Sequence, residues 1–432
     1  MDAGKDHISE LPDELLNAIL VRLRSTRAAA RTGALSRRWH HLWTPLPGLF
    51  LSEGPRDAAF LDTVDAALAA CDSVPALKGL TVVLSRGGGI PAERVAVWLR
   101  FASEHVVGPL FLLLPTPELD GEEEAAAVLD FPACEGVTRV ELSLHGPWRV
   151  RPLPSGLFRA LTDLTIVCEY MDGSELTALV CKQCPRLTHL KLYFMLANAS
   201  DISIRSDSLQ SLSFSVCKAW LLEIVAPRLE KLSISISPDE AQITAPKLLE
   251  IVWADGNYDP RHHRFDDVGR RLRLLELGQI MSLMQKFDEV DELKLGIYIP
   301  QGIPGYESFL NETNELPKCK ILSISLPWRH GLVPGMLHLL RSCNSTRKIS
   351  LLVCSDYVSR YPCLPSCPCC SAESHKIDDI SLNSLEEVVM KYRLNSPPPL
   401  TEEVLKKIRS MFQPKVEVNF YVLSDWKWVR LD

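Results

Sequence analysis

Four cysteines in a short stretch near the C-terminal end have the side chains best suited to metal chemistry. They are Cys363, Cys367, Cys369 and Cys370, and His375 follows them. Thiolates and imidazoles are the ligands with which proteins hold Zn²⁺ in a tetrahedron. However, the spacing fits a Cys-x-x-Cys knuckle poorly, and no second pair stands at a zinc-finger distance. We therefore predict a proline-rich loop without a bound cofactor, and keep a zinc site at these cysteines as the alternative.

A second pair, Cys181 and Cys184, has the Cys-x-x-Cys spacing of redox motifs. A thioredoxin-like site needs a preceding strand and an exposed first thiol, whereas this pair ends an expected helix, so we expect both thiols in the core. The sequence contains neither a Gly-x-Ser-x-Gly elbow nor a His-Glu-x-x-His motif. We predict that the protein is not an enzyme, with a cysteine-based zinc or redox protein as a rival.

Composition excludes several classes of partner. The 432 residues are 46% hydrophobic and 23% charged, with a net charge of −7, so no basic field predicts nucleic-acid binding. The most apolar run, 110–114, is far too short to span a bilayer, and the N-terminus has no apolar leader segment. We therefore expect no membrane contact, reduced thiols, and a location in the cytoplasm and/or nucleus.

The first 45 residues predict three short helices with more apolar surface than they can bury by themselves. Pro12 suits a first helical turn, and leucines and isoleucines from Leu15 to Leu23 follow at helical spacing. A final turn carries Trp39 and Trp43 and stops at Pro45. An apolar patch that so small a unit leaves uncovered is typical of a protein–protein contact.

These residues resemble the F-box. The matching elements are Leu11-Pro12-x-x-Leu15-Leu16-x-x-Ile19-Leu20-x-x-Leu23 and Leu35-Ser36-Arg37-Arg38-Trp39-x-x-Leu42-Trp43. The resemblance implies a helical module that docks on the Skp-type adaptor, and through it the cullin, of a ubiquitin ligase. The chain departs from the family at Ser25-Thr26, where many relatives carry an acidic residue. The family's adaptor contacts would fall on Leu11, Pro12, Leu15, Leu16, Ile19, Leu35 and Trp39.

The long middle of the chain repeats an apolar-x-x-apolar-x-apolar pattern. From Val137 on, copies start roughly 18 to 29 residues apart, as in leucine-rich repeats, and a first copy lies earlier in the chain. The copies start at Leu77, Val137, Leu161, Leu187, Leu209, Leu229, Leu248, Leu272, Val290 and Cys319. Each copy predicts a short strand whose apolar residues alternate inward, and stacked copies would form a curved parallel sheet with a continuous core. We expect helices over 56–71, 91–105 and 174–181, and irregular turns in return segments such as 226–227 and 245–246.

The predicted fold class is thus α/β, a small all-α F-box followed by a curved leucine-rich-repeat solenoid. A strand at 385–390, a helix at 401–411 and a strand at 416–422 would cap its end, and this unit resembles weakly the FBD module of plant F-box proteins. The expected domains are the F-box (1–47), a linker and capping helix (48–75), the repeats (76–360), the cysteine-rich loop (361–376) and the cap (377–432).

This organisation predicts a substrate-recognition subunit of a Skp–cullin–F-box ubiquitin ligase, in which the repeats bind an unknown target protein. The alternative is a repeat scaffold outside any ligase. The expected target contacts are polar or aromatic residues between the inward leucines of the strands: Arg139, Glu141, His189, Lys191, Tyr193, Ser211, Ser213, Lys231, Ser233 and Glu250.

Overall fold

A computed structural model describes most of the repeat region and part of both ends. The described residues are 11–22, 48–54, 59–72, 76–84, 88–119, 126–255, 257–278, 282–297, 303–314, 316–327, 338–339, 345–354, 384–393, 416–424 and 427–431. They form two compact units. The first comprises residues 1–229 and 238–244, and the second comprises residues 230–237 and 245–432.

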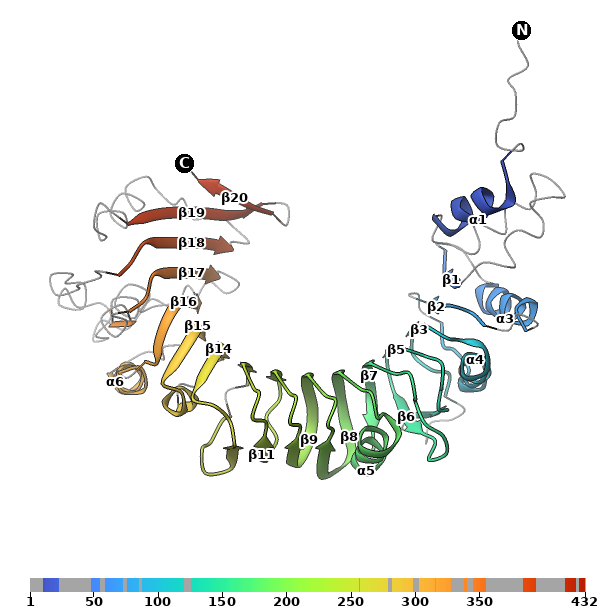
Figure 1. Cartoon of the computed structure of the whole chain (residues 1–432), viewed down its shortest axis with the longest axis horizontal. Helices are drawn as coiled ribbons and strands as arrows, with labels where there is room; N and C mark the ends of the chain where they lie inside the picture. Colours follow the sequence, from blue (N-terminus) through green and yellow to red (C-terminus); the bar gives the residue numbers. More distant parts are fainter. Residues whose placement is uncertain are drawn as a thin grey trace, which may run out of the picture. The chain divides into compact units, whose positions relative to one another are not determined.

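The first unit is built around a ladder of parallel strands (Figure 1). Each strand pairs with the next: β1 (Leu49–Ser52), β2 (Leu80–Val83), β3 (Pro109–Leu114), β5 (Arg139–Leu144), β7 (Asp163–Met171), β8 (His189–Arg205) and β9 (Ser211–Val225). The register is regular, since Val140 pairs with Leu164 and Leu164 with Leu190. The same positions of successive copies therefore lie side by side.

A second wall closes the back of the first unit. It begins with helices α3 (Phe60–Ala70) and α4 (Ala92–His105) and continues as strands. The strands are β4 (Ala127–Phe131), β6 (Trp148–Pro152), the C-terminal ends of β7, β8 and β9, and β11 (Glu240–Thr244). Helix α5 (Gly173–Ala178) and the π-helical turn η3 (Leu179–Gln183) follow β7. The return segments at 226–227 and 245–246 are turns, as expected, and they directly follow β9 and β11 of this wall, whose strand pairing the sequence analysis did not predict.

The second unit repeats the ladder. Parallel pairing connects β10 (Lys231–Ile234), β12 (Glu250–Trp253), β14 (Arg271–Leu277), β15 (Glu289–Gly296), β16 (Lys318–Pro327), β17 (Lys348–Cys354), β18 (Glu387–Arg393) and β19 (Glu417–Ser424). The last strand, β20 (Lys427–Leu431), turns back and pairs antiparallel with β19. Strand β13 (His263–Asp266), the 3₁₀ turn η4 (Ser282–Lys286) and helix α6 (Ile303–Glu312) lie in the connections.

The repeat pattern explains the core. In the nine copies from Val137 to Cys319, every one of the three apolar positions is at most 3% exposed. Alternate residues of a strand point to opposite faces, so the residues between them form the open face. Indole nitrogens buried in the core find acceptors: Trp148 Nε1 donates to the carbonyl of Pro115 at 2.8 Å, and Trp253 Nε1 to Ser237 Oγ at 2.9 Å.

The repeat prediction and the parallel sheet are confirmed, and so are the three expected helices, as α3, α4 and α5 with η3. At the C-terminal end the two expected strands are β18 and β19, whereas β20 was not expected. The predicted helix at 401–411, the second and third F-box helices, and the cysteine-rich loop lie outside the described residues.

Candidate functional site

Helix α1 (Asp13–Arg22) begins directly after Pro12, with acidic residues in its first turn and Arg22 in its last. This charge distribution suits the helix dipole. Leu16 and Leu20, one turn apart, are 0% and 1% exposed, whereas Leu15 and Ile19 are 51% and 40% exposed. The helix therefore buries one apolar stripe and leaves a second stripe exposed.

Five of the seven predicted adaptor contacts lie in the described residues. Pro12, Leu15 and Ile19 are exposed, Leu11 is half-buried, and Leu16 is fully buried. The remaining two, Leu35 and Trp39, lie outside them. The side chain of Leu16 thus supports the helix from inside, and the uncovered stripe is Leu15 with Ile19.

The predicted target contacts of the first unit come together on the open face in two adjacent rows. One row runs across four strands through Arg139, Asp163, His189 and Ser211. The next row runs through Glu141, Thr165, Lys191 and Ser213. Tyr193 stands beside them and is 56% exposed. The parallel register therefore converts side chains spaced along the sequence into one continuous surface.

Asp163, which the sequence analysis did not single out, organises this surface. Its Oδ1 lies 3.3 Å from Arg139 Nη2 and 3.5 Å from His189 Nδ1. The carboxylate also accepts a hydrogen bond from Thr162 Oγ1 at 2.6 Å. Asp163 occupies the same position of its copy as Arg139 and His189. The repeat pattern could therefore have predicted that Asp163 lies beside them on the open face.

In the second unit, two of the three predicted contacts, Lys231 and Glu250, join an ion-pair cluster with Arg273. Glu250 Oε2 lies 3.1 Å from Lys231 Nζ, and Glu250 Oε1 accepts a 2.8 Å hydrogen bond from Arg273 Nε. Burial raises the pKa of Glu250, but the hydrogen bonds from Lys231 and Arg273 outweigh it and hold that pKa below its ordinary value. Ser233 pairs with Val252 in the next row.

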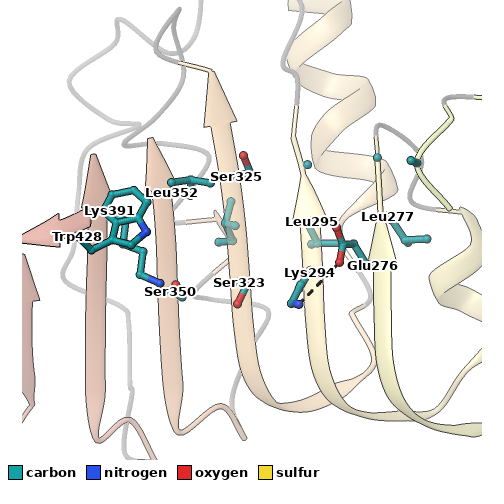
Figure 2. A pocket seen from close by; sticks show the side chains of 14 residues that line it. Glu276, Leu277, Lys294, Leu295, Ser323, Ser325, Ser350, Leu352, Lys391 and Trp428 are labelled. Carbon is teal, nitrogen blue, oxygen red and sulfur yellow. Dashed lines mark ion pairs between the residues drawn. The ribbon is translucent and has the colours of Figure 1, made fainter. Parts of the chain in front are cut away.

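A pocket of about 570 Å³ opens on the strand face of the second unit. Figure 2 shows Trp428 and Lys391 together at one end and the Glu276–Lys294 ion pair toward the other. The floor is made of small residues because Gly278, Gly296 and Ser325 occupy one row. A Cβ at Gly278 would lie 2.1 Å from the carbonyl oxygen of Ala254, so only glycine fits there.

The charges of this pocket differ between its ends. Lys294 Nζ is shared between Glu276 and Glu292, at 3.7 Å from each carboxylate. Lys391 Nζ instead lies 5.6 Å from the centre of the Trp428 ring, in a cation–π contact. Among the described residues no carboxylate forms an ion pair with Lys391. The pocket thus offers an aromatic wall, an uncompensated cation and the hydroxyls of Ser323 and Ser350.

The buried thiols are poor nucleophiles. Burial raises the pKa of Cys134, Cys168 and Cys184 to about 12, so the thiolate that redox chemistry needs is disfavoured. Cys181 is half-buried and its Sγ contacts the backbone of Ser203 at 3.4 Å. Within the described ranges, which leave out 355–383, no three side chains of metal-ligating type form a cluster.

The pocket residues that the sequence analysis did not single out include Glu276, Lys391 and Trp428. The outward position of Glu276 could have been predicted from the sequence, because it lies between the inward Leu275 and Leu277 of a recognised copy. The place of Trp428 could not have been predicted in this way, because it reaches the pocket through the antiparallel pairing of β20 with β19.

Among the helices in the described part of the chain, none has the length and apolar character needed to span a membrane.

Comparison with known proteins agrees with this structure. Residues 95–256 match the family described as "FBD-associated F-box protein At5g56370, LRR repeats". A putative F-box/LRR-repeat protein of Arabidopsis thaliana is 26% identical over 392 residues, which cover 85% of this chain and 76% of the relative. In fold and in these matches the chain is similar to leucine-rich-repeat proteins of the plant F-box type.

Two further Arabidopsis relatives indicate a particular group within that class. A putative FBD-associated F-box protein is 27% identical over 265 residues, covering 58% of this chain and 59% of the relative. An F-box/FBD/LRR-repeat protein is 53% identical over 47 residues, or 11% of each chain. The resemblance to FBD-associated F-box proteins with leucine-rich repeats is thereby confirmed.

Proposed function

We propose that this protein is the substrate-recognition subunit of a Skp–cullin–F-box ubiquitin ligase. The observation that carries the proposal is the exposed stripe of Leu15 and Ile19 on α1, on a segment that resembles the F-box. Leu16 and Leu20 are buried, so the exposed stripe, and not the buried one, would meet a Skp-type adaptor. The names of the relatives support the same assignment.

The open faces of the strands are the proposed target surface. Repeat proteins use such extended surfaces to bind other proteins. In the second unit the pocket beside Trp428 supplies an aromatic anchor, which is the kind of residue that dominates binding energy at interfaces. Lys391 would pair with an acidic side chain of the target, since no described carboxylate already holds it.

No catalytic group is required of such a subunit. Holding the target close to the conjugating enzyme that carries ubiquitin raises the effective concentration of the target's lysines near that enzyme. This proximity accelerates the transfer of ubiquitin. The ubiquitin-transfer chemistry would belong to other subunits of the ligase. We place this activity in the cytoplasm and/or nucleus.

The adaptor contact is tested with a double variant, Leu15→Asp with Ile19→Asp, in a co-purification with a Skp-type adaptor. Because both side chains are exposed, the variant should fold, and we expect its affinity for the adaptor to fall at least about 100-fold, as for loss of an interface hot spot. Val97→Asp is the matched control, since Val97 is 55% exposed on α4.

The assignment fails if the unmodified chain does not bind the adaptor, or if the double variant binds as well as the Val97→Asp control. Either result would favour a repeat scaffold that acts outside a ligase. Circular dichroism of both variants establishes that the folded content is unchanged.

A further inference from the structure

A second cavity, of about 450 Å³, lies in the first unit beside α5. One side is formed by residues 151–154 at the end of β6, and the other by α5 and η3. It belongs to the back wall of the unit, where the rows of predicted target contacts do not run. Nothing in the proposed ligase function uses it.

Two residues that line this cavity, Gln183 and Glu175, each carry a buried acceptor with no hydrogen-bond partner among the described residues. Gln183 is only 6% exposed, and its Nε2 donates to the carbonyl of Leu153 at 2.7 Å. That bond fixes the amide, and leaves Gln183 Oε1 buried without a donor. Glu175 Oε2 is likewise buried and without a hydrogen bond. Unpaired buried acceptors are costly, so such a pair marks a place where a donor is missing.

The neighbouring charged groups do not supply that donor. Arg151 Nε is bonded to Asp130 at 2.6 Å. Asp172 Oδ1 caps α5 by accepting bonds from the backbone N–H of Ser174 at 2.9 Å and from Ser174 Oγ at 2.6 Å. In the part of the chain that the structure describes, the buried Nε of Arg149 has no hydrogen-bond partner.

The balance of charge around Glu175 is negative. Arg149 and Arg151 contribute two positive charges, and Asp130, Asp172 and Glu175 contribute three negative charges. Burial raises the pKa of Glu175, and the attraction of Arg149 does not reverse that effect. A positively charged donor would therefore stabilise the ionised carboxylate of Glu175 and would also supply the hydrogen bonds that the two buried acceptors lack.

We propose that this cavity binds an ammonium or guanidinium group. Its N–H donors would bond Gln183 Oε1 and Glu175 Oε2 together, and the cavity volume suits a short alkyl chain as well as the charged end. Such a group is carried by a lysine or arginine side chain of another protein and by free alkylamines. The shared chemistry is one cation with several N–H donors.

The test titrates the full chain with butylammonium and, in parallel, with uncharged butanol, while following the side-chain amide signal of Gln183 by NMR. We expect a saturable shift with butylammonium and none with butanol. Glu175→Gln should weaken butylammonium binding at least about tenfold, because it removes the charge but keeps the shape. Glu135→Gln, at an exposed carboxylate elsewhere in the same unit, should leave the affinity unchanged.

An equal response to both probes, no saturable shift, or an affinity that Glu175→Gln does not change would each overturn the proposal and leave water as the occupant. A third titration, with N-acetyl-lysine methylamide, distinguishes the sources. Binding tighter than that of butylammonium assigns a protein side chain, and equal or weaker binding assigns a free amine.

Discussion

At the scale of residues, the open face of the second unit is held in place by charges that satisfy one another. Glu250 is the clearest case, since its carboxylate contacts both Lys231 and Arg273 while its side chain is only 18% exposed. The two cations are each 52% exposed, so water screens much of the attraction. The cluster therefore contributes a modest stabilisation and a fixed arrangement of side chains.

We predict that Glu250→Gln lowers the free energy of unfolding by about 1 kcal/mol at neutral pH. The folded pKa of Glu250 lies below its ordinary value, so this contribution is present above the unfolded pKa and is lost as the pH falls through the folded one. The difference between variant and wild type should shrink toward zero in acid. Urea unfolding at neutral and acidic pH measures it, and a deficit independent of pH would contradict it.

At the scale of elements, α3 and α4 are joined by a hydrogen bond from a buried indole and by ion pairs of Arg94 with Asp62 and Asp65. Trp98 on α4 is 0% exposed and its Nε1 donates to Asp65 Oδ1 on α3 at 2.7 Å. Arg94 Nη2, also on α4, lies 2.6 Å from Asp62 Oδ1. The buried indole fills core volume as well as making a hydrogen bond, whereas the Arg94 pair is largely solvated.

We predict that Trp98→Phe lowers the free energy of unfolding by about 2–3 kcal/mol, through lost packing and the lost hydrogen bond. The matched variant Arg94→Gln, which removes the exposed link between the same two helices, should cost at most about 0.5 kcal/mol. Thermal and urea unfolding of both variants provide the comparison. Equal losses would show that the packing of the indole does not hold the helices together.

At the scale of the whole molecule, the proposed function assigns two separable tasks to one chain. Helix α1 in the first unit would bind the adaptor, and the pocket with Lys391 and Trp428 in the second unit would bind the target. The two surfaces share no residue. Each task should therefore be removable without the other.

We predict such a separation for two variants expressed in cells with blocked proteasomes. The first variant, Lys391→Glu with Ser325→Trp, reverses the charge of the pocket's lysine and fills the pocket floor. It should still bind the adaptor but should no longer capture the proteins that the wild type enriches. The second variant, Leu15→Asp with Ile19→Asp, should lose the adaptor but still capture those proteins. Quantitative mass spectrometry of the captured proteins measures both, with Lys427→Glu on the same hairpin as control. Loss of both partners in either variant would contradict separate surfaces.

Much of the fold could be predicted because its core is periodic. The alternation around Leu190 and Leu192 specifies a strand and its buried face, and the same pattern repeats in the other copies. The copy on β17 was missed since Thr346 occupies the first apolar position, where it is 2% exposed and its Oγ1 donates to the carbonyl of Cys319 at 3.3 Å. The back-wall strands were missed because they pair across copies and have no strong local pattern.

The sequence by itself determined the repeats, the inward residues, the main helices and the apolar stripe on α1, since each depends on neighbours a few positions apart. Only the tertiary structure decided which outward side chains meet. Asp163 joins Arg139 to His189 through the parallel register, and Trp428 covers Lys391 through the return of β20. These contacts connect residues far apart in the chain, and their geometry is set by strand pairing rather than by local spacing.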